Sequence, residues 1–195
     1  EGVMELVVLA VAVFVVLGVI GYFVGIYNGL IMVRNNIDKA WANIDVLLKQ
    51  RHDELPKLVD TCKQYMKHEQ GTLEKVIQAR SRVSDARESQ DVAALGAAEG
   101  ALRAGLGNLF AVAESYPDLK ANESFLQLQL RITGLENAIA DRREFYNDSV
   151  NINNVRIEQF PDLIVARMFN FEAFHLLRFA SEELKDVDIS QGFKS

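Results

Sequence analysis

The feature that most constrains this chain is a run without charged side chains, from Leu6 to Val33. A bilayer core is about 30 Å thick and is crossed by about 20 apolar helical residues. Leu6–Ile26 has this length, and fifteen of its side chains are Val, Leu, Ile or Phe. The run therefore predicts a transmembrane helix, with a short tail at 1–5 and a juxtamembrane extension that completes the segment 6–33.

A cleaved signal peptide is the alternative interpretation of this run. Such a peptide would have a basic start, a shorter apolar core and a cleavage site of small residues. The N-terminal residues instead include Glu1 and Glu5, and Tyr27-Asn28 is a poor cleavage site. We therefore favour a permanent anchor.

Basic residues indicate how the span is oriented. None precedes it, whereas Arg34, Lys39, Lys49 and Arg51 follow it closely. Lys and Arg are enriched on the cytoplasmic side of membrane helices. The pattern predicts an N-terminus outside and a helical domain in the cytoplasm, where the single cysteine, Cys62, would stay reduced.

Four glycines of the span, Gly18, Gly21, Gly25 and Gly29, fall on one helix face. Small residues at such spacing let membrane helices approach closely, which predicts packing against another subunit. The alternative is that glycine is simply common in membrane helices.

The segment after the span is acidic and helical. From Arg34 onward the chain has 21 Lys/Arg and 25 Asp/Glu, since Glu1 and Glu5 lie before this segment. The net charge of the segment is therefore −4. This balance argues against nucleic acid as a partner. Apolar residues recur every three or four positions, and no segment shows sustained strand alternation.

This periodicity predicts three long helices in the segment. The first stripe runs from Ile37 to Val83, is broken only around Arg51 and is bent rather than ended by Pro56. The second helix begins near Asp91, and the third runs from about 123 to 151, followed by a shorter helical segment interrupted at Phe160-Pro161. The predicted fold is all-α: a transmembrane helix that continues into an elongated antiparallel four-helix bundle with coiled-coil-like packing, over 34–160.

Several short motifs resemble those of the LemA family. In the first half they are Tyr27-Asn28, Arg34-Asn35, Ala40-Trp41, Ile44-Asp45-Val46, Arg51-His52-Asp53 and His68-Glu69. In the second half they are Tyr116-Pro117-Asp118-Leu119-Lys120-Ala121, Leu135-Glu136, Tyr146-Asn147, Val150-Asn151 and Phe160-Pro161. The resemblance extends to about residue 170. The chain departs from the family pattern at Ile152-Asn153, where a second Tyr-Asn is usual.

The resemblance implies a bacterial inner-membrane protein with one N-terminal span and a four-helix-bundle domain. The family has no agreed enzymatic reaction. Its members are linked to membrane proteases and envelope stress, and one branch is linked to magnetosome membranes.

The residues themselves give no pattern for catalysis or metal binding. Glu172-Ala173-Phe174-His175 is the only Glu-x-x-His pair, where a di-iron bundle needs two. His68-Glu69 begins like a zinc-protease motif, but the second histidine is replaced by Thr72. Cys62 lies on the apolar stripe, as a small buried hydrophobe does. We predict no catalytic residue, no cofactor and no metal.

Polar residues gather at three places on the predicted helices. Glu136 and the charged residues around it, from Arg131 to Asp148, fit a solvated helix face. One asparagine-rich group contains Asn28, Arg34, Asn35 and Asn36, and the other contains Asn147, Asn151, Asn153 and Asn154. These two groups could meet in a polar site, but we favour side chains that satisfy backbone groups at a bend and a turn.

The C-terminal segment, 161–195, is predicted as an apolar helical segment and tail. Its aromatic residues Phe169, Phe171, Phe174 and Phe179 are too dense to face one bundle core. Exposed apolar clusters usually mark a contact. We therefore expect 161–180 to pack on a neighbouring subunit or to lie on the bilayer surface.

Together these features favour a non-enzymatic scaffold or adaptor that acts through helix packing. Its expected partners are the lipid bilayer, further copies of the chain and other membrane proteins. The alternative is a regulator of a membrane protease in envelope stress. A third possibility is a hydrolase or metalloenzyme.

Overall fold

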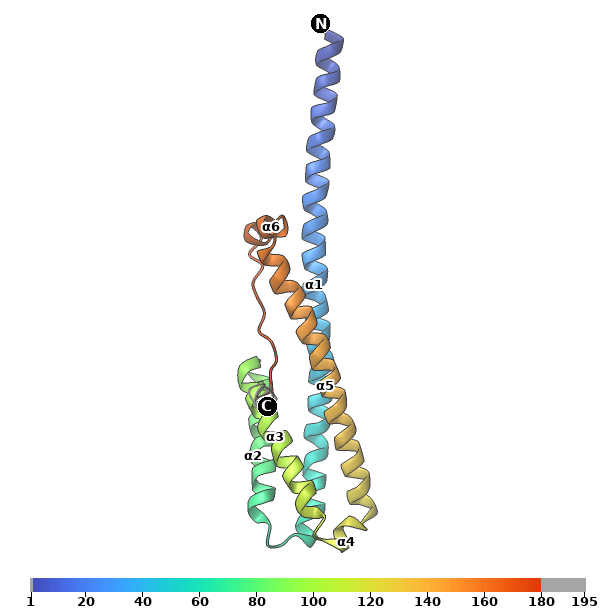
Figure 1. Ribbon diagram of the computed structural model, residues 1–195, viewed down its shortest axis with the longest axis vertical. Helices are drawn as coiled ribbons and strands as arrows, with labels where there is room; N and C mark the ends of the chain where they lie inside the picture. The colour runs from blue at the N-terminus through green and yellow to red at the C-terminus, as the bar shows by residue number, and fades with distance from the viewer. Residues whose placement is uncertain (1, 180–195) are drawn as a thin grey trace, which may run out of the picture. The chain divides into compact units, whose positions relative to one another are not determined.

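The computed structural model describes residues 2–179, and every regular element in that range is a helix (Figure 1). The helices are α1 (Gly2–Tyr65), α2 (Gln70–Glu88), α3 (Val92–Ala113), α4 (Pro117–Lys120), α5 (Glu123–Glu158) and α6 (Asp162–Met168). The predicted all-α class and the long apolar N-terminal helix are confirmed. The part of the predicted C-terminal segment at 180–195 lies outside the described residues.

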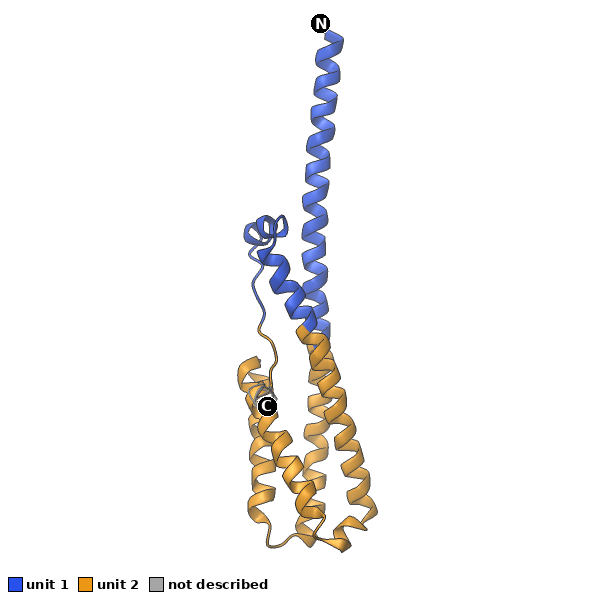
Figure 2. Ribbon diagram, in the orientation of Figure 1, with its two compact units in different colours: residues 1–40, 148–174 blue, residues 41–147, 175–195 orange. Residues whose placement is uncertain are grey.

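The chain forms two compact units (Figure 2). Unit 1 contains residues 1–40 and 148–174, and unit 2 contains residues 41–147 and 175–195. Helices α1 and α5 each contribute a segment to both units.

The core of unit 2 is built from the apolar stripes of α1, α2, α3 and α5. The buried apolar residues of α1 in this unit are Ile44, Leu48, Leu55, Leu58, Val59 and Cys62, all of them on the predicted stripe. Their main counterparts are Val76 and Val83 of α2, Leu95, Leu102 and Leu109 of α3, and Phe125, Ile132 and Ile139 of α5. The helical period therefore identified the core face of each helix correctly.

The prediction of one long first helix from Ile37 to Val83 is wrong. Helix α1 ends at Tyr65, and a turn over 66–69 leads into α2. In this turn the amide of Met66 bonds to the carbonyl of Cys62 at 2.8 Å, and the amide of Glu69 bonds to that of Met66 at 3.1 Å. The turn contains neither glycine nor proline, and it keeps the three-to-four-residue spacing of apolar residues, so periodicity alone could not reveal it.

Helix α1 passes through Pro56 without ending, as predicted. Proline has no N–H, so the carbonyl of His52, four residues earlier, loses its helical donor. Arg80 of α2 replaces that donor: its Nε bonds to the His52 carbonyl oxygen at 3.0 Å, and its Nη2 lies 2.7 Å from His52 Nε2. Partial burial and the Arg80 cation lower the pKa of His52, which favours the neutral imidazole that can accept this second bond.

This contact predicts a coupling between Pro56 and Arg80. Arg80→Ala should destabilise unit 2 by about 1–2 kcal/mol, because it leaves the His52 carbonyl without a donor. In a Pro56→Ala background the new backbone N–H can serve that carbonyl, so Arg80→Ala should cost less. Urea unfolding followed by the fluorescence of Trp41, which packs on Tyr146 in unit 2, measures both costs. Equal costs in the two backgrounds would contradict this account of the Arg80–His52 contact.

The remaining helix ends show how local sequence fixes the boundaries. Asp91 caps α3 through its Oδ1, which accepts from the amide of Ala94 at 2.9 Å, so the predicted start near Asp91 is confirmed. Helix α5 runs to Glu158 without interruption, beyond the predicted end at Asn151. After α6, residues 171–179 are not helical, so the helical prediction for the C-terminal segment is correct only over Asp162–Met168.

Unit 1 has a small core where α6 packs on α1. Ile26 and Leu30 of α1 are buried together with Val165 and Ala166 of α6. The apolar residues of α1 before Phe23 are exposed, and the most hydrophobic part of the helix is covered by none of the described chain. A helix this long and apolar, left uncovered, has the properties of a membrane-spanning helix.

Candidate functional site

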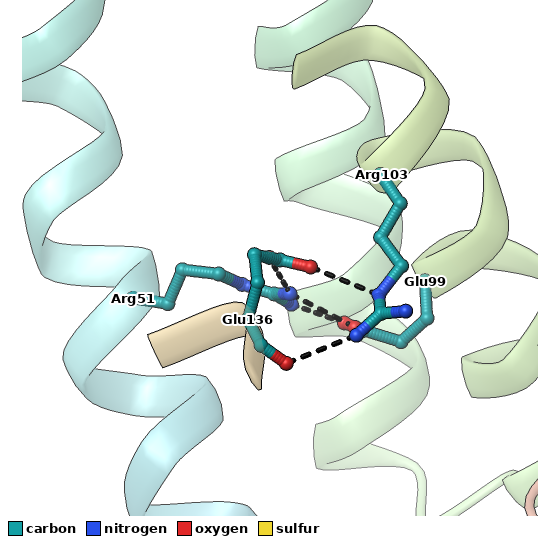
Figure 3. A network of polar contacts seen from close by, with 4 residues as sticks. All are labelled: Arg51, Glu99, Arg103 and Glu136. Carbon is teal, nitrogen blue, oxygen red and sulfur yellow. Dashed lines mark hydrogen bonds and ion pairs between the residues drawn. The ribbon is translucent and has the colours of Figure 1, made fainter. Parts of the chain in front are cut away.

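The most distinctive polar feature of unit 2 is a network of four charged side chains on three helices (Figure 3). Arg51 of α1 makes a bidentate pair with Glu99 of α3, with one bond at 2.9 Å from Nη1 to Oε2. Its Nη1 also donates to Glu136 of α5. Arg103 of α3 completes the network: its Nε lies 2.9 Å from Glu136 Oε2, and its Nη2 donates to the Glu136 backbone carbonyl at 2.9 Å.

The network lies inside the protein rather than on its surface. The side chains of Arg51 and Glu99 are each 1 % exposed, and that of Glu136 is 16 % exposed. Burial alone would lower the pKa of Arg51, but the Glu99 and Glu136 carboxylates outweigh it and hold that pKa above its usual value. Two cations and two anions therefore neutralise one another, and each carboxylate has an arginine donor. This arrangement joins three helices and leaves no free acid or base for catalysis among these four residues.

The sequence carries signals for this network. Arg51 interrupts the first apolar stripe, at the position of a buried cation. The prediction of a solvated face is wrong for Glu136, which binds Arg51 and Arg103. Glu99 is a charged residue in an otherwise small and apolar stretch of α3.

Residues 175–179 of unit 2 are held on the helices by backbone contacts. The side chain of Asn147 donates to the carbonyl of Leu177 at 3.0 Å and accepts from the Leu177 amide at 2.8 Å. The hydroxyl of Tyr146 donates to the carbonyl of His175 at 3.0 Å. The amide side chain of Asn147 therefore forms both backbone hydrogen bonds of Leu177, as a neighbouring strand would do in a sheet.

Two side chains and one glycine complete the docking of this segment. Leu177 and Phe179 are buried, and the guanidinium groups of Arg103 and Arg143 lie 4.9 and 4.2 Å from the centre of the Phe179 ring. A Cβ at Gly96 of α3 would overlap the carbonyl oxygen of Arg178 and lie 3.1 Å from its carbonyl carbon. Glycine at this position is what lets the segment approach α3.

In unit 1, asparagine side chains likewise bind the backbone of residues 172–174. Asn154 donates to the Phe174 carbonyl at 2.9 Å and accepts from the Phe174 amide at 3.0 Å. Asn153, which is fully buried, donates to the Glu172 carbonyl at 3.0 Å. The favoured interpretation of this asparagine group, satisfaction of backbone groups, is confirmed for Asn147, Asn153 and Asn154, whereas Asn151 is exposed.

The four phenylalanines predicted at an interface occupy different environments. They do not all face one core: Phe179 is buried in unit 2, and Phe171 packs on the core of unit 1, so these two lack the exposure that the interface prediction assumes. Phe174 is half-buried, and Phe169 is exposed beside Tyr27, with 4.7 Å between the ring centres. An interface role stays a prediction, and it is best founded for Phe169.

The four glycines of the span also differ. A Cβ at Gly18, Gly21 or Gly25 would meet nothing within 4 Å, so this face of the helix is open. A Cβ at Gly29 would lie 2.9 Å from Nη2 of Arg156 in the same unit. Gly29 therefore accommodates a side chain of its own chain, while packing on another subunit stays a prediction for the other three.

No metal-binding group or reactive thiol stands out in the described part of the chain. Within residues 2–179 no cluster of three or more His, Cys, Asp or Glu is placed to hold a metal ion. Burial raises the pKa of Cys62 to about 12, so its thiol stays protonated at neutral pH. A hollow of about 610 Å³ between α2 and α3 is lined mainly by alanine side chains.

Comparison with known proteins agrees with the motifs found in the sequence. The model of the LemA family matches residues 40–190. Protein LemA of Metamycoplasma hominis is 30 % identical over 169 residues, which cover 86 % of this chain and 74 % of that protein.

Two magnetosome proteins are similar over a shorter stretch. Magnetosome protein MamQ 2 of Paramagnetospirillum magneticum is 34 % identical over 68 residues, 35 % of this chain and 25 % of that protein. Magnetosome protein MamQ of Magnetospirillum gryphiswaldense is 32 % identical over 85 residues, 42 % of this chain and 31 % of that protein. The chain thus spans only about a third or less of these relatives.

The range matched by the family model includes the Arg51–Glu99–Glu136 network and the docked segment of unit 2. The family that the sequence motifs suggested is therefore the correct one. This chain belongs to the LemA family.

Proposed function

We propose that the chain is a non-enzymatic membrane protein that acts as an oligomeric scaffold or adaptor. In this proposal, α1 anchors it in the bilayer and associates with α1 of other copies, and unit 2 presents a rigid helical surface to other membrane proteins. A bacterial inner membrane, with unit 2 in the cytoplasm, is the location that the basic flank of the span favours.

The observation that carries the proposal is the open glycine face of α1. Gly18, Gly21 and Gly25 lie on an apolar helix that the rest of the described chain leaves uncovered. Between membrane helices there is no hydrophobic driving force, so association depends on close van der Waals contact. A face of glycines provides that contact at low entropic cost.

The charge network of unit 2 supports a binding role over a catalytic one. Its four charged groups are used to hold α1, α3 and α5 together, and its carboxylates are neutralised by arginine. Such a network fixes the register of helices that apolar contacts alone would fix less sharply. A helical unit with one fixed shape is suited to present a surface to a partner.

Substitutions on the glycine face test the proposal. Gly21→Leu and Gly25→Leu together should weaken self-association about tenfold or more, since a loss of roughly 1.4 kcal/mol in packing has that effect. The matched control is Ala12→Leu with Val19→Leu, which adds side-chain volume to the opposite face of the same helix. The measurement is mild crosslinking in native membranes, followed by purification and mass determination.

Three outcomes decide between the candidate functions. Self-crosslinked oligomers that the glycine variant loses and the control keeps would support the scaffold. A membrane protease recovered in stoichiometric amount, with no self-crosslinking, would support the regulator instead. Self-association that is equal in both variants would refute the role of the glycine face.

A further inference from the structure

We propose that α6 and its two flanking phenylalanines, Phe160 and Phe169, lie in the headgroup boundary of the leaflet from which α1 emerges. The partner in this proposal is a lipid surface, and the function is a second membrane contact beside the spanning helix. The proposal rests on α1 crossing the bilayer and is independent of self-association.

The contacts of α6 place it at the end of the membrane span. Val165 and Ala166 pack on Ile26 and Leu30 of α1. The ring of Tyr27 lies 4.7 Å from that of Phe169 and 5.9 Å from that of Phe171. Leu6–Ile26 is long enough to fill a bilayer core of about 30 Å, so Tyr27 stands where tyrosines gather at the membrane–water boundary.

The surface of α6 that faces away from α1 carries large apolar side chains beside one cation, Arg167. Ile164 and Met168 are exposed and, at a spacing of four residues, share one face of the helix. Phe160 before the helix is 80 % exposed, and Phe169 after it is also exposed. Four large apolar side chains around one short helix are costly in water but suit an interfacial segment.

The charged groups near α6 are one paired acid, two exposed cations and the exposed Glu158 at the end of α5. Asp162, the acidic residue of α6, is paired with Arg156 at 2.6 Å, so it does not repel anionic headgroups with a free charge. Arg167 is exposed on α6 itself. Arg34 follows Tyr27 by seven residues, about 10 Å along the helix, where its cation can reach lipid phosphates.

A lipid surface explains these exposed residues better than a second copy does. They adjoin the apolar surface of α1, which is itself exposed from Val3 to Tyr22. The bilayer and its boundary cover both surfaces together. A copy packed on the glycine face of α1 would lie on another side of that helix than Ile26 and Leu30, on which α6 packs, so α6 would still face lipid.

Tryptophan quenching in lipid vesicles tests the proposal. Phe160→Trp is made in a Trp41→Phe background, so that the new tryptophan is the only one in the chain. The full chain is placed in vesicles of phosphatidylcholine and phosphatidylglycerol that carry a quencher either near the headgroup or deep in the acyl chain. We expect the shallow quencher to remove about half of the emission and the deep quencher much less, because interfacial helices enter only about 5–10 Å.

Ile152→Trp is the matched control in the same unit and background. Ile152 is exposed on α5, more than a turn before Ile157, the α5 residue that packs on the core of unit 1. Its tryptophan should be quenched by aqueous iodide and spared by both lipid quenchers. Ile164→Trp repeats the test on α6 itself, and circular dichroism shows that each variant keeps its helices.

Two results would overturn the proposal. If Phe160→Trp and Ile164→Trp behave like Ile152→Trp, α6 is in water. If they are protected from iodide and from both lipid quenchers, α6 is covered by protein, and a second copy or another partner is the occupant.

Discussion

Arg51→Met should destabilise unit 2 by about 3–5 kcal/mol, the effect of leaving a buried carboxylate without its cation. Glu99 is fully buried, and its bidentate partner is Arg51. The loss of Arg51 destabilises the Glu136 carboxylate less, because Arg103 Nε remains 2.9 Å from its Oε2. The measurement is urea unfolding of the detergent-solubilised full chain, followed by Trp41 fluorescence.

The double variant Arg51→Met/Glu99→Met is the decisive control for this prediction. It removes the cation and the anion together and fills the space with apolar side chains, a change that is often neutral or stabilising. We expect its stability to return to within about 1–2 kcal/mol of the wild type. A double variant as unstable as Arg51→Met would mean that packing, and not charge balance, sets the cost.

Gly96→Ala should release residues 175–179 from unit 2 and expose Leu177 and Phe179. The added Cβ overlaps the carbonyl oxygen of Arg178, which belongs to the backbone and cannot move alone. The expected loss is roughly 3–6 kcal/mol, because burying a Leu or Phe side chain is worth about 1.5–3 kcal/mol each. Amide hydrogen exchange at 175–179 and urea unfolding measure the release and its cost.

Gly107→Ala on the same helix is the matched control. A Cβ at Gly107 meets nothing within 4 Å, so the substitution should gain helix propensity and stabilise α3 by up to about 1 kcal/mol. The two glycine-to-alanine changes should therefore have opposite signs. Slow exchange at 175–179 in Gly96→Ala, with unchanged stability, would contradict the docking described for this segment.

Features of the fold that depend on local periodicity were predictable from the sequence. The three-to-four-residue spacing identified the core faces of α1, α3 and α5, and Asp91 marked the start of α3. The turn at 66–69 was not predictable in this way, because it changes the direction of the chain without changing the spacing of apolar residues.

Features that depend on pairing between distant residues were not predictable. Glu99 and Glu136 lie 48 and 85 positions after Arg51, and only the folded chain brings the three together. The non-helical path of 171–179 has the same origin. Its backbone is bound by the side chains of Asn147 and Asn154 on α5, and the backbone of Arg178 lies against Gly96 of α3. The apolar composition of the segment does not indicate either contact.

The most direct test of the proposed function is the mass of the wild-type full-length chain after extraction from the membrane in a mild detergent. The open glycine face of α1 predicts a defined particle that contains two or more copies of the chain and no other protein. A particle with a single copy of the chain, at concentrations where membrane-helix dimers persist, would contradict the account of this protein as a self-assembling scaffold.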